Sequence, residues 1–285
     1  MSTTTTKKQV AIVTGASSGM GLGITQALLL HGYCVVANSR NISKSKDLKS
    51  SSDLILVDGD IGKLDTAIKV ADAAIKHFDR IDLLVNNAGI NVAKPFTEYT
   101  PADFELMIGT NVAGYFFITQ RVVTQMRKQK SGHIVGISTV LVDQPLAIET
   151  VTLQVVTKST MPAFHRALAM EFLADGIRAN TISPGVVDTP MHDKYDHEIL
   201  KKLMPIPRLV KISEIVDALL YLESASMVNG ENIRIDGGAH AGAKWWSNNK
   251  QHRCMCILQI IGLLVTVGNA IHLIHHKPAD LLPHE

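Results

Sequence analysis

The sequence has little excess charge, few cysteines and no internal repeat. Lysine and arginine outnumber aspartate and glutamate by only 28 to 26, and no basic stripe stands out, so we expect no nucleic-acid partner. The three cysteines have no regular spacing and give no disulfide framework. This scarcity is typical of a reducing compartment, and we expect a cytoplasmic protein. The apolar run Val10–Val13 is too short for the core of a signal peptide.

Short apolar runs alternate with longer amphipathic stretches along most of the chain. The apolar runs are rich in β-branched residues and predict strands that are buried on both faces. These strands are expected near Val10–Thr14, Cys34–Asn38, Leu54–Val57, Ile81–Asn86, His133–Ser138, Arg178–Ser183 and Asn232–Ile235. Helices are expected over Gly21–Leu30, Leu64–Phe78, Pro101–Lys130, Gln154–Leu173 and Ser213–Leu222. The alternation predicts a Rossmann-type, doubly wound α/β fold, with a seven-stranded parallel sheet and helices on both faces.

The composition divides the chain into three parts. Residues 1–7 are polar and rich in threonine, and we expect them to form a disordered lead-in. Residues 8–243 carry the alternating pattern and are enough for one large domain. Residues 244–285 lack this pattern and are treated as a C-terminal tail. Within the domain, only residues 40–53 join the second and third strands, so any helix there is short.

A glycine-rich loop follows the first strand and opens the first helix. Its spacing is GxxxGxG, at Gly15, Gly19 and Gly21. A strand, a glycine turn and a helix N-terminus in this order direct backbone N–H groups and the helix dipole toward a phosphate. The same glycines alone are also compatible with an ordinary strand-to-helix turn.

Further motifs stand at the ends of later strands. Asn-Asn-Ala-Gly at 86–89 ends the fourth, Pro184-Gly185 ends the sixth and Asp-Gly-Gly at 236–238 ends the seventh, while Asn111 lies within the long third helix. In this order and spacing the set resembles the classical short-chain dehydrogenases/reductases, over residues 8–242. The resemblance implies NAD(P)-dependent hydride transfer between a carbonyl and an alcohol on a small molecule.

The resemblance also implies where the cofactor is held. The glycine loop would frame its phosphates, residues 60–61 would flank the adenine, and residues 87–89 would line its path. Lys158 would hold the nicotinamide ribose, and residues 184–189 would approach the carboxamide. The implied cofactor-binding residues are Gly15, Ser17, Ser18, Gly19, Met20, Gly21, Ser39, Arg40, Asp60, Ile61, Asn87, Ala88, Gly89, Lys158, Pro184, Gly185, Val187 and Thr189.

The end of the second strand bears on the choice of cofactor. A site that prefers NAD(H) places a carboxylate there to bind the ribose hydroxyls. This chain has Ser39 at that position, followed by Arg40, whose guanidinium can pair with a 2′-phosphate. The glycine loop adds no second cation, because Ser18 stands where one is sometimes found. We expect NADP(H) rather than NAD(H), with a solvated surface role for Arg40 as the alternative.

The family's catalytic set of Asn, Ser, Tyr and Lys is matched only in part. Asn111 matches the Asn and Lys158 matches the Lys. The Ser position falls on Thr139, with Ser138 as the alternative if the register differs by one. The Tyr, four residues before the Lys on one helix face, is replaced by Gln154.

Glutamine donates hydrogen bonds but has no proton to transfer near neutral pH. Three alternatives follow. Gln154 and Thr139 polarise the carbonyl while Lys158, or a water that it orients, supplies the proton. The stretch from Thr139 to Gln154 is about two residues longer than is usual in the family, and a carboxylate of this loop, Asp143 or Glu149, takes over as the acid. The domain binds NADP(H) without catalysing a reaction, as a sensor or partner subunit. We favour an oxidoreductase with an atypical active site.

The resemblance implies that the segment after the sixth strand, Thr189–Arg208, covers the substrate. Its apolar residues indicate a mostly apolar lid, with packing of these residues against the core as the alternative. Its candidate residues are Met191, His192, Tyr195, Leu200, Leu203 and Met204. The helices Pro101–Lys130 and Gln154–Leu173 match those that pair across dimers in the family. Phe116, Phe117 and Phe164 on them fit either an interface or the core, and we expect a homodimer or homotetramer.

The tail contains a mostly apolar stretch at 256–274, near the length of a membrane span. Gln259, Thr266, Asn269 and His272 interrupt it, so we expect a helix packed on protein rather than a membrane anchor. The histidines and cysteines of the tail fit no standard zinc spacing, and we expect no metal.

Overall fold

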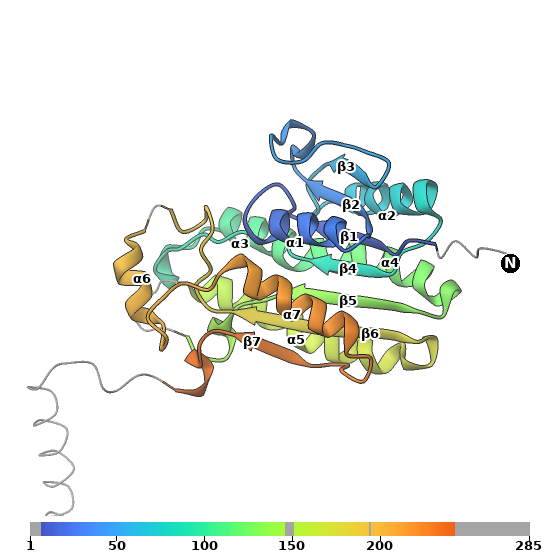
Figure 1. Ribbon diagram of the computed structural model, residues 1–285. Coiled ribbons are helices and arrows are strands. Elements are labelled where there is room, and N and C mark those ends of the chain that lie inside the picture. Colours follow the sequence, from blue (N-terminus) through green and yellow to red (C-terminus); the bar gives the residue numbers. More distant parts are fainter. Residues whose placement is uncertain (1–6, 146–150, 194, 243–285) are drawn as a thin grey trace, which may run out of the picture. The chain divides into compact units, whose positions relative to one another are not determined.

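The computed structural model describes residues 7–145, 151–193 and 195–242, and in these residues a parallel sheet carries helices on both faces (Figure 1). The seven strands lie in the order β3-β2-β1-β4-β5-β6-β7. They are β1 Val10–Thr14, β2 Cys34–Ser39, β3 Leu54–Asp58, β4 Leu83–Asn86, β5 Gly132–Ile137, β6 Ile177–Pro184 and β7 Asn232–Ile235. The predicted Rossmann-type fold is confirmed.

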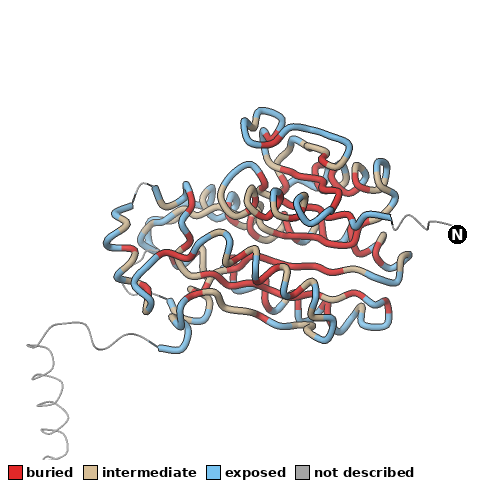
Figure 2. The backbone as a smooth tube through the Cα atoms, in the orientation of Figure 1, coloured by how far each residue is buried: buried red, intermediate tan, exposed pale blue. Residues whose placement is uncertain are grey.

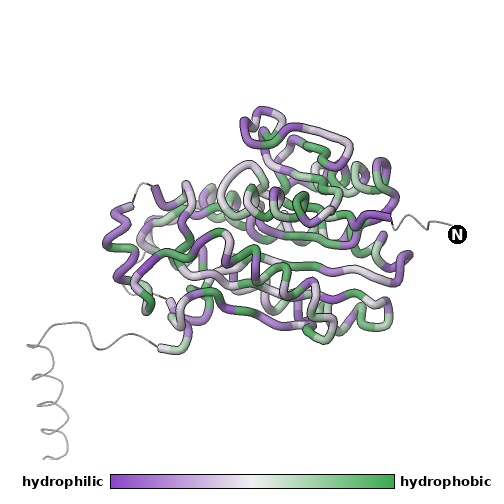
Figure 3. Tube along the Cα trace, viewed as in Figure 1, coloured by the Kyte–Doolittle hydropathy of each residue, from purple (hydrophilic) through white to green (hydrophobic). Residues whose placement is uncertain are grey.

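Alternate residues of the strands supply two separate cores. Ala11 and Val13 of β1 pack with α1 and α7, whereas Val10 and Ile12 pack with α2, α4 and the end of α5. These helices are α1 Gly19–Leu30, α2 Leu64–Phe78, α4 Gly114–Gln129, α5 Thr152–Glu171 and α7 Ile212–Ser224. Figure 2 shows the central strands buried along their length, and Figure 3 shows that they are also the most hydrophobic segments.

The remaining helices are short. They are α3 Pro101–Ile108, α6 His197–Leu203, and single turns at Ile42–Lys44, Phe96–Glu98, Val140–Val142, Leu173–Asp175 and Ala239–Ala241. Helix α6 lies beyond the carboxyl ends of the strands (Figure 1). Of the residues between β2 and β3, only Ile42–Lys44 are helical, and Ser43 fastens this turn to Asp58 through its backbone N–H at 2.8 Å and its hydroxyl. The expectation of a short helix in this connection is confirmed.

The segment predicted as one helix over Pro101–Lys130 is interrupted. Helix α3 ends at Ile108, a π-helical turn follows over Gly109–Ala113, and α4 then runs to Gln129. Strand β4 also begins later than predicted, at Leu83. The N–H of Ile81 donates to the side chain of Gln129 at 2.9 Å, and the carbonyl of Ile81 accepts from the same amide at 2.7 Å. Ile81 therefore does not join the sheet.

The described residues contain no helix that is long and apolar enough to cross a membrane. They also contain no cluster of three or more histidine, cysteine or acidic side chains placed to hold a metal ion. The tail stretch at 256–274 and most of the lead-in lie outside the described residues.

Candidate cofactor and active site

The glycine loop between β1 and α1 has a shape that side chains would prevent. Gly15 and Gly19 have positive φ angles of 67° and 54°, a backbone conformation that glycine adopts without strain. A Cβ on Gly21 would lie 2.2 Å from the carbonyl oxygen of Gly15 and 2.5 Å from Nδ2 of Asn87. The first turn of α1 is therefore pressed against the loop and against the end of β4.

The N-terminus of α1 fits an anionic group. Ser18 is its N-cap residue, but in the described part of the chain the Ser18 side chain does not cap the helix. The first turn contains no acidic residue, and Ser17 and Ser18 are exposed. N–H groups without a capping side chain, together with the positive end of the helix dipole, favour a phosphate at this point.

Asn87 joins the glycine loop to the end of β4. Its side-chain amide donates to the carbonyl oxygens of Thr14 at 2.9 Å and Gly15 at 3.2 Å. The hydroxyl of Thr14 accepts from the N–H groups of Asn87 and Ala88, both at 3.1 Å. The segment 87–89 is thus held against the loop and forms one wall of the candidate cofactor cleft.

The residues expected at the adenosine end lie at the ends of β2 and β3. Ser39 is half-buried and Arg40 is exposed. Among the described residues, no hydrogen bond or ion pair engages the Arg40 guanidinium. Ile61 is buried against the start of α4, where a Cβ on Gly114 would lie 3.0 Å from its Cγ2, and Asp60 accepts the N–H of Gly62 at 3.0 Å.

Asn111 lies in the π-helical turn and clamps the segment that follows Gly89. Its Oδ1 accepts the N–H of Ile90 at 2.8 Å, and its Nδ2 donates to the Ile90 carbonyl at 2.9 Å. A third bond runs from Nδ2 to the hydroxyl of Thr157 at 3.1 Å. The side chain is only 1% exposed, so its amide holds the chain in place rather than facing solvent.

Lys158 projects from α5 into the same buried region. Its Nζ donates to the carbonyl of Ile137 at 2.7 Å, and a Cβ on Gly89 would lie 3.0 Å from this nitrogen. Burial lowers the pKa of the Lys158 amine to about 8, because the charged form loses its hydration. The structure therefore places a readily titrating amine beside the 87–89 segment.

The two candidate hydroxyls after β5 have different surroundings. The Ser138 hydroxyl is buried and donates its proton to the Lys158 carbonyl at 3.0 Å. The Thr139 hydroxyl accepts the N–H of Leu141 at 3.3 Å, so its own proton stays available. Gln154 is half-buried one turn before Lys158 on α5, and its carbonyl accepts from Thr157 at 3.1 Å.

The segment after β6 returns to the glycine loop. The N–H of Gly185 donates to the Ile235 carbonyl at 3.0 Å, which continues the pairing of β6 with β7 by one residue. Val187 and Thr189, further along the segment, are buried. A Cβ on Gly19 would lie 3.3 Å from Cγ2 of Thr189. Residues 184–189 thus run from the carboxyl end of β6 to the start of α1.

His192 and the two candidate acids have other partners or lie outside the described residues. Nδ1 of His192 lies 2.7 Å from the Val187 carbonyl, which ties this ring to its own loop. Asp143 forms a 2.9 Å ion pair with Arg234 of β7. Glu149 lies outside the described residues.

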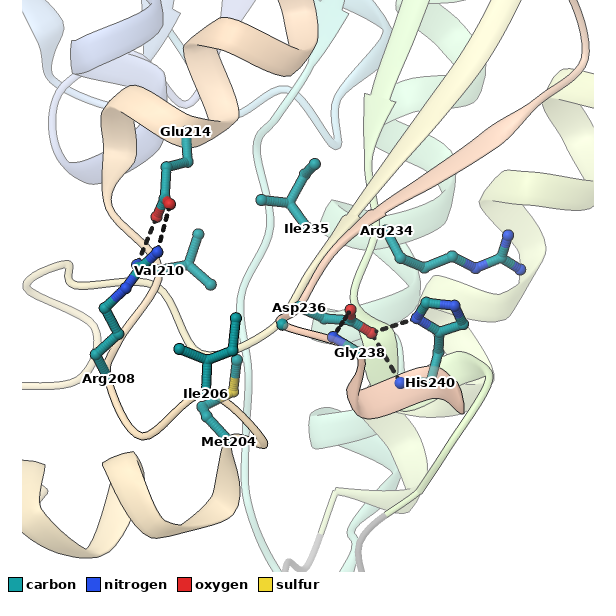
Figure 4. Close-up of a pocket in the computed structure, with 11 residues that line it drawn as sticks. Met204, Ile206, Arg208, Val210, Glu214, Arg234, Ile235, Asp236, Gly238 and His240 are labelled. Carbon is teal, nitrogen blue, oxygen red and sulfur yellow. Dashed lines mark hydrogen bonds and ion pairs between the residues drawn. The ribbon is translucent and has the colours of Figure 1, made fainter. Parts of the chain in front are cut away.

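A cavity of about 320 Å³ lies between the end of the lid and the turn after β7 (Figure 4). Arg208 and Glu214 pair on one side of it, Asp236 and His240 on the other, with Ile206 between them. Asp236 is nearly fully buried. Its carboxylate accepts the N–H of Gly238 at 2.9 Å and the N–H of His240 at 2.8 Å, and it pairs with the His240 ring. Sequence reasoning did not single out Arg208, Arg234 or His240. The Asp-Gly-Gly motif was the available signal for this region.

The aromatic residues predicted for an interface form one cluster on α4 and α5. Phe164 lies 5.1 Å from Tyr115 and 5.9 Å from Phe116, between ring centroids. Phe117 and Phe164 pack partly into the core, whereas Phe116 remains 45% exposed.

Known proteins resemble this chain over the whole described domain. A family model described as enoyl-(acyl carrier protein) reductase matches residues 15–240. Acetoacetyl-CoA reductase of an Acinetobacter species is 33% identical, covering 82% of this chain and 98% of that protein. D-threitol dehydrogenase of Mycolicibacterium smegmatis is 34% identical, covering 81% and 92%.

Solved structures agree with these relatives. ElxO with NADP bound superposes with a TM-score of 0.77 at 27% identity, covering 83% of this chain and all of that one. A 3-ketoacyl-(acyl-carrier-protein) reductase from Brucella melitensis, complexed with NADH, superposes with a TM-score of 0.74 at 25% identity, covering 81% and 98%. Together with the glycine loop, the Asn111 clamp and the buried Lys158, these matches show that the chain belongs to the short-chain dehydrogenase/reductase family.

Proposed function

We propose that the protein is an NADP(H)-dependent oxidoreductase that interconverts a carbonyl and an alcohol on a small, mostly apolar substrate. The observation that carries this proposal is the convergence of Lys158, Asn111 and Gly89 beside the glycine loop. Asn111 and Lys158 are buried and are held by hydrogen bonds to protein groups, so contacts within the protein are enough to fix this arrangement. The apolar composition of the lid segment, which includes exposed Met191, supports an apolar substrate.

The preference for NADP(H) rests on the end of β2. Arg40 is exposed, and its guanidinium makes no hydrogen bond or ion pair within the described residues. Ser39 has no carboxylate that would repel a 2′-phosphate. Charge-assisted hydrogen bonds contribute about 1.5–3 kcal/mol, so Arg40→Ala should raise the Kd for NADPH by about tenfold to a hundredfold. The Kd for NADH should change little.

Fluorescence titration with both cofactors measures this difference. Lys46→Ala is the matched control, because Lys46 is an exposed cation of the same β2–β3 connection. It should weaken both affinities only slightly, because a distant exposed cation acts through screened long-range charge alone. Equal affinities of the wild-type protein for NADPH and NADH would refute the proposed preference.

When bound, NADPH supplies the hydride. We propose that the Thr139 hydroxyl and the Gln154 amide donate hydrogen bonds to the substrate oxygen, and that Ser138 fixes the Lys158 backbone. Gln154 has no proton to give near neutral pH. Lys158, directly or through a water that it orients, then delivers the proton. Its pKa of about 8 makes it an effective acid near neutral pH.

The pH dependence tests this role of Lys158. Its protonated form is the proton donor, so the rate of carbonyl reduction should fall as the pH rises through about 8. Single-turnover oxidation of NADPH against a panel of carbonyl compounds gives this profile. Lys158→Ala should lose about 10²- to 10⁴-fold in rate, the usual loss when a positioned acid is removed. A wild-type rate that is flat between pH 6 and 9 would exclude Lys158 as the donor.

A second candidate function is NADP(H) binding without catalysis, and Gln154 is the observation that favours it. A solved ElxO variant with tyrosine changed to phenylalanine has NADPH bound, so in that protein the cofactor binds without that tyrosine. The discriminating variant is Gln154→Tyr. Activity in this variant together with an inactive wild-type protein supports the sensor or partner role, whereas activity in the wild-type protein supports the enzyme.

We also propose a homodimer or homotetramer that forms through α4 and α5, where Phe116 remains exposed. Light scattering of the wild-type protein and of Phe116→Ser gives the masses. A monomeric wild-type protein at micromolar concentration would refute the assembly.

A further inference from the structure

One face of α5 carries two threonines that fasten this helix to α4 and the π-helical turn. Thr157 is wholly buried, and its hydroxyl donates to the Gln154 carbonyl at 3.1 Å and accepts from Nδ2 of Asn111 at 3.1 Å. Three residues later, the Thr160 hydroxyl accepts from the Tyr115 hydroxyl at 2.7 Å and donates to the Thr157 carbonyl at 2.6 Å. Both hydroxyls are therefore used as donor and acceptor.

The contact of Thr157 with Asn111 lies nearer to the candidate site than the contact of Thr160 with Tyr115. Thr157 lies between Gln154 and Lys158 in sequence, and its hydroxyl reaches the amide of Asn111. That amide already holds both backbone groups of Ile90. Ile90 follows Gly89, whose Cβ position is 3.0 Å from Nζ of Lys158. The Thr157 hydroxyl thus connects α5, through Asn111, to the 89–90 segment. The same segment lies beside the Lys158 amine, which also comes from α5.

We propose that Thr157 is a positioning residue, which sets the distance between α5 and the 89–90 segment by orienting the Asn111 amide. Without the hydroxyl, Nδ2 of Asn111 keeps its bond to Ile90 but loses the bond that fixes its orientation relative to α5. The link to cofactor binding rests on the proposed function. The link to Ile90 does not, because it is a property of the free protein.

Thr157→Val removes the hydroxyl and keeps the shape of the side chain. The variant loses both hydrogen bonds of this hydroxyl, and loss of the bond from Asn111 should speed hydrogen exchange at the Ile90 amide by about five- to tenfold. The Kd for NADPH should rise by about three- to tenfold, since the 87–89 wall is less firmly held. Thr157→Ser restores the hydroxyl and should bring both quantities to within about twofold of wild type.

Ser159→Ala is the matched control. Ser159 lies on the same helix, but its exposed hydroxyl bonds only to the Val155 carbonyl one turn earlier, at 2.6 Å. This variant should change neither the Ile90 exchange nor the Kd. The amide of Ile12 in β1 is a second control, because faster exchange there would report global destabilisation.

The outcomes separate the two proposals. Faster exchange at Ile90 but not at Ile12 in Thr157→Val, with rescue by serine, supports the positioning role even if the wild-type protein fails to bind NADPH. That failure would overturn the proposed function alone. Unchanged Ile90 exchange in Thr157→Val, or equal acceleration at Ile12, would overturn the positioning role.

Discussion

Replacing Gly21 with alanine should damage the cofactor cleft more than any surface change of the same size. The new Cβ would lie 2.2 Å from the Gly15 carbonyl oxygen, whereas ordinary carbon–oxygen contacts begin at about 3.3 Å. A shift of about 1 Å between α1 and the loop is therefore required. Backbone cannot rotate away as a flexible side chain can, so we expect a loss of about 1–3 kcal/mol in the free energy of unfolding.

The same shift should weaken cofactor binding. Hydrogen bonds to charged groups contribute about 1.5–3 kcal/mol each, so displacing one N–H of the proposed phosphate site should raise the Kd for NADPH by about tenfold to a hundredfold. Urea unfolding and NADPH fluorescence titration measure the two effects separately.

Gly109→Ala is the control for this substitution. Gly109 begins the π-helical turn with a φ of −55°. Apart from its chain neighbours and the backbone of its own helix, no atom of the described residues lies within 4 Å of the position of its Cβ. Alanine there should leave NADPH binding unchanged and leave stability equal or higher by about 0.4–1 kcal/mol. If Gly21→Ala matches wild type in both assays, the reasoning from loop geometry is refuted.

Two further substitutions and one double-mutant cycle test the packing and the charges elsewhere in the domain. Burial keeps the pKa of His133 below its usual value. On acidification the unfolded chain therefore takes up a proton before the folded one does, and the free energy of unfolding should fall as the pH drops below about 6.5. Urea unfolding at pH 7.5 and 5.5 should show a smaller fall in this free energy for His133→Gln than for the wild-type protein. A Cβ on Gly136 would lie 2.3 Å from the His165 ring, and Gly136→Ala should cost about 1–3 kcal/mol of unfolding free energy, which a wild-type urea midpoint would contradict. The Arg234–Asp143 ion pair is about a third exposed, and a double-mutant cycle should give a coupling of at most about 1 kcal/mol; a value of 2 or more would refute this.

All seven strands were predicted from the hydrophobic pattern, and the bounds of most of them differ from the expected ones by one or two residues. Strands β1 and β7 and helix α2 have the predicted bounds, because local periodicity and turn residues determine where they begin and end. The π-helical turn at Gly109–Ala113 was not predicted. Its residues keep a helical hydrophobic pattern, and the bonds from Asn111 to Ile90 and Thr157 come from distant parts of the chain.

In the candidate site too, features that depend on local sequence could be predicted, whereas contacts between distant parts of the chain could not. The glycine loop could be placed from sequence because each glycine has a local conformational requirement. Thr139 was placed at the Ser position with Ser138 as the alternative, since the alignment could differ by one residue. The bond from the Ser138 hydroxyl to the Lys158 carbonyl joins distant parts of the chain and could not be predicted. The Asp143–Arg234 pair joins residues 91 positions apart, and no spacing rule connects them.

The bonds from Asn87 to Thr14 and Gly15 have a consequence for the kinetics and thermodynamics of binding. They fix the glycine loop with protein groups alone, so little conformational entropy is lost when a dinucleotide arrives. Preorganisation of this kind leaves the association rate to diffusion and charge rather than to loop closure. Differences in affinity among variants of the loop should therefore appear chiefly in the dissociation rate.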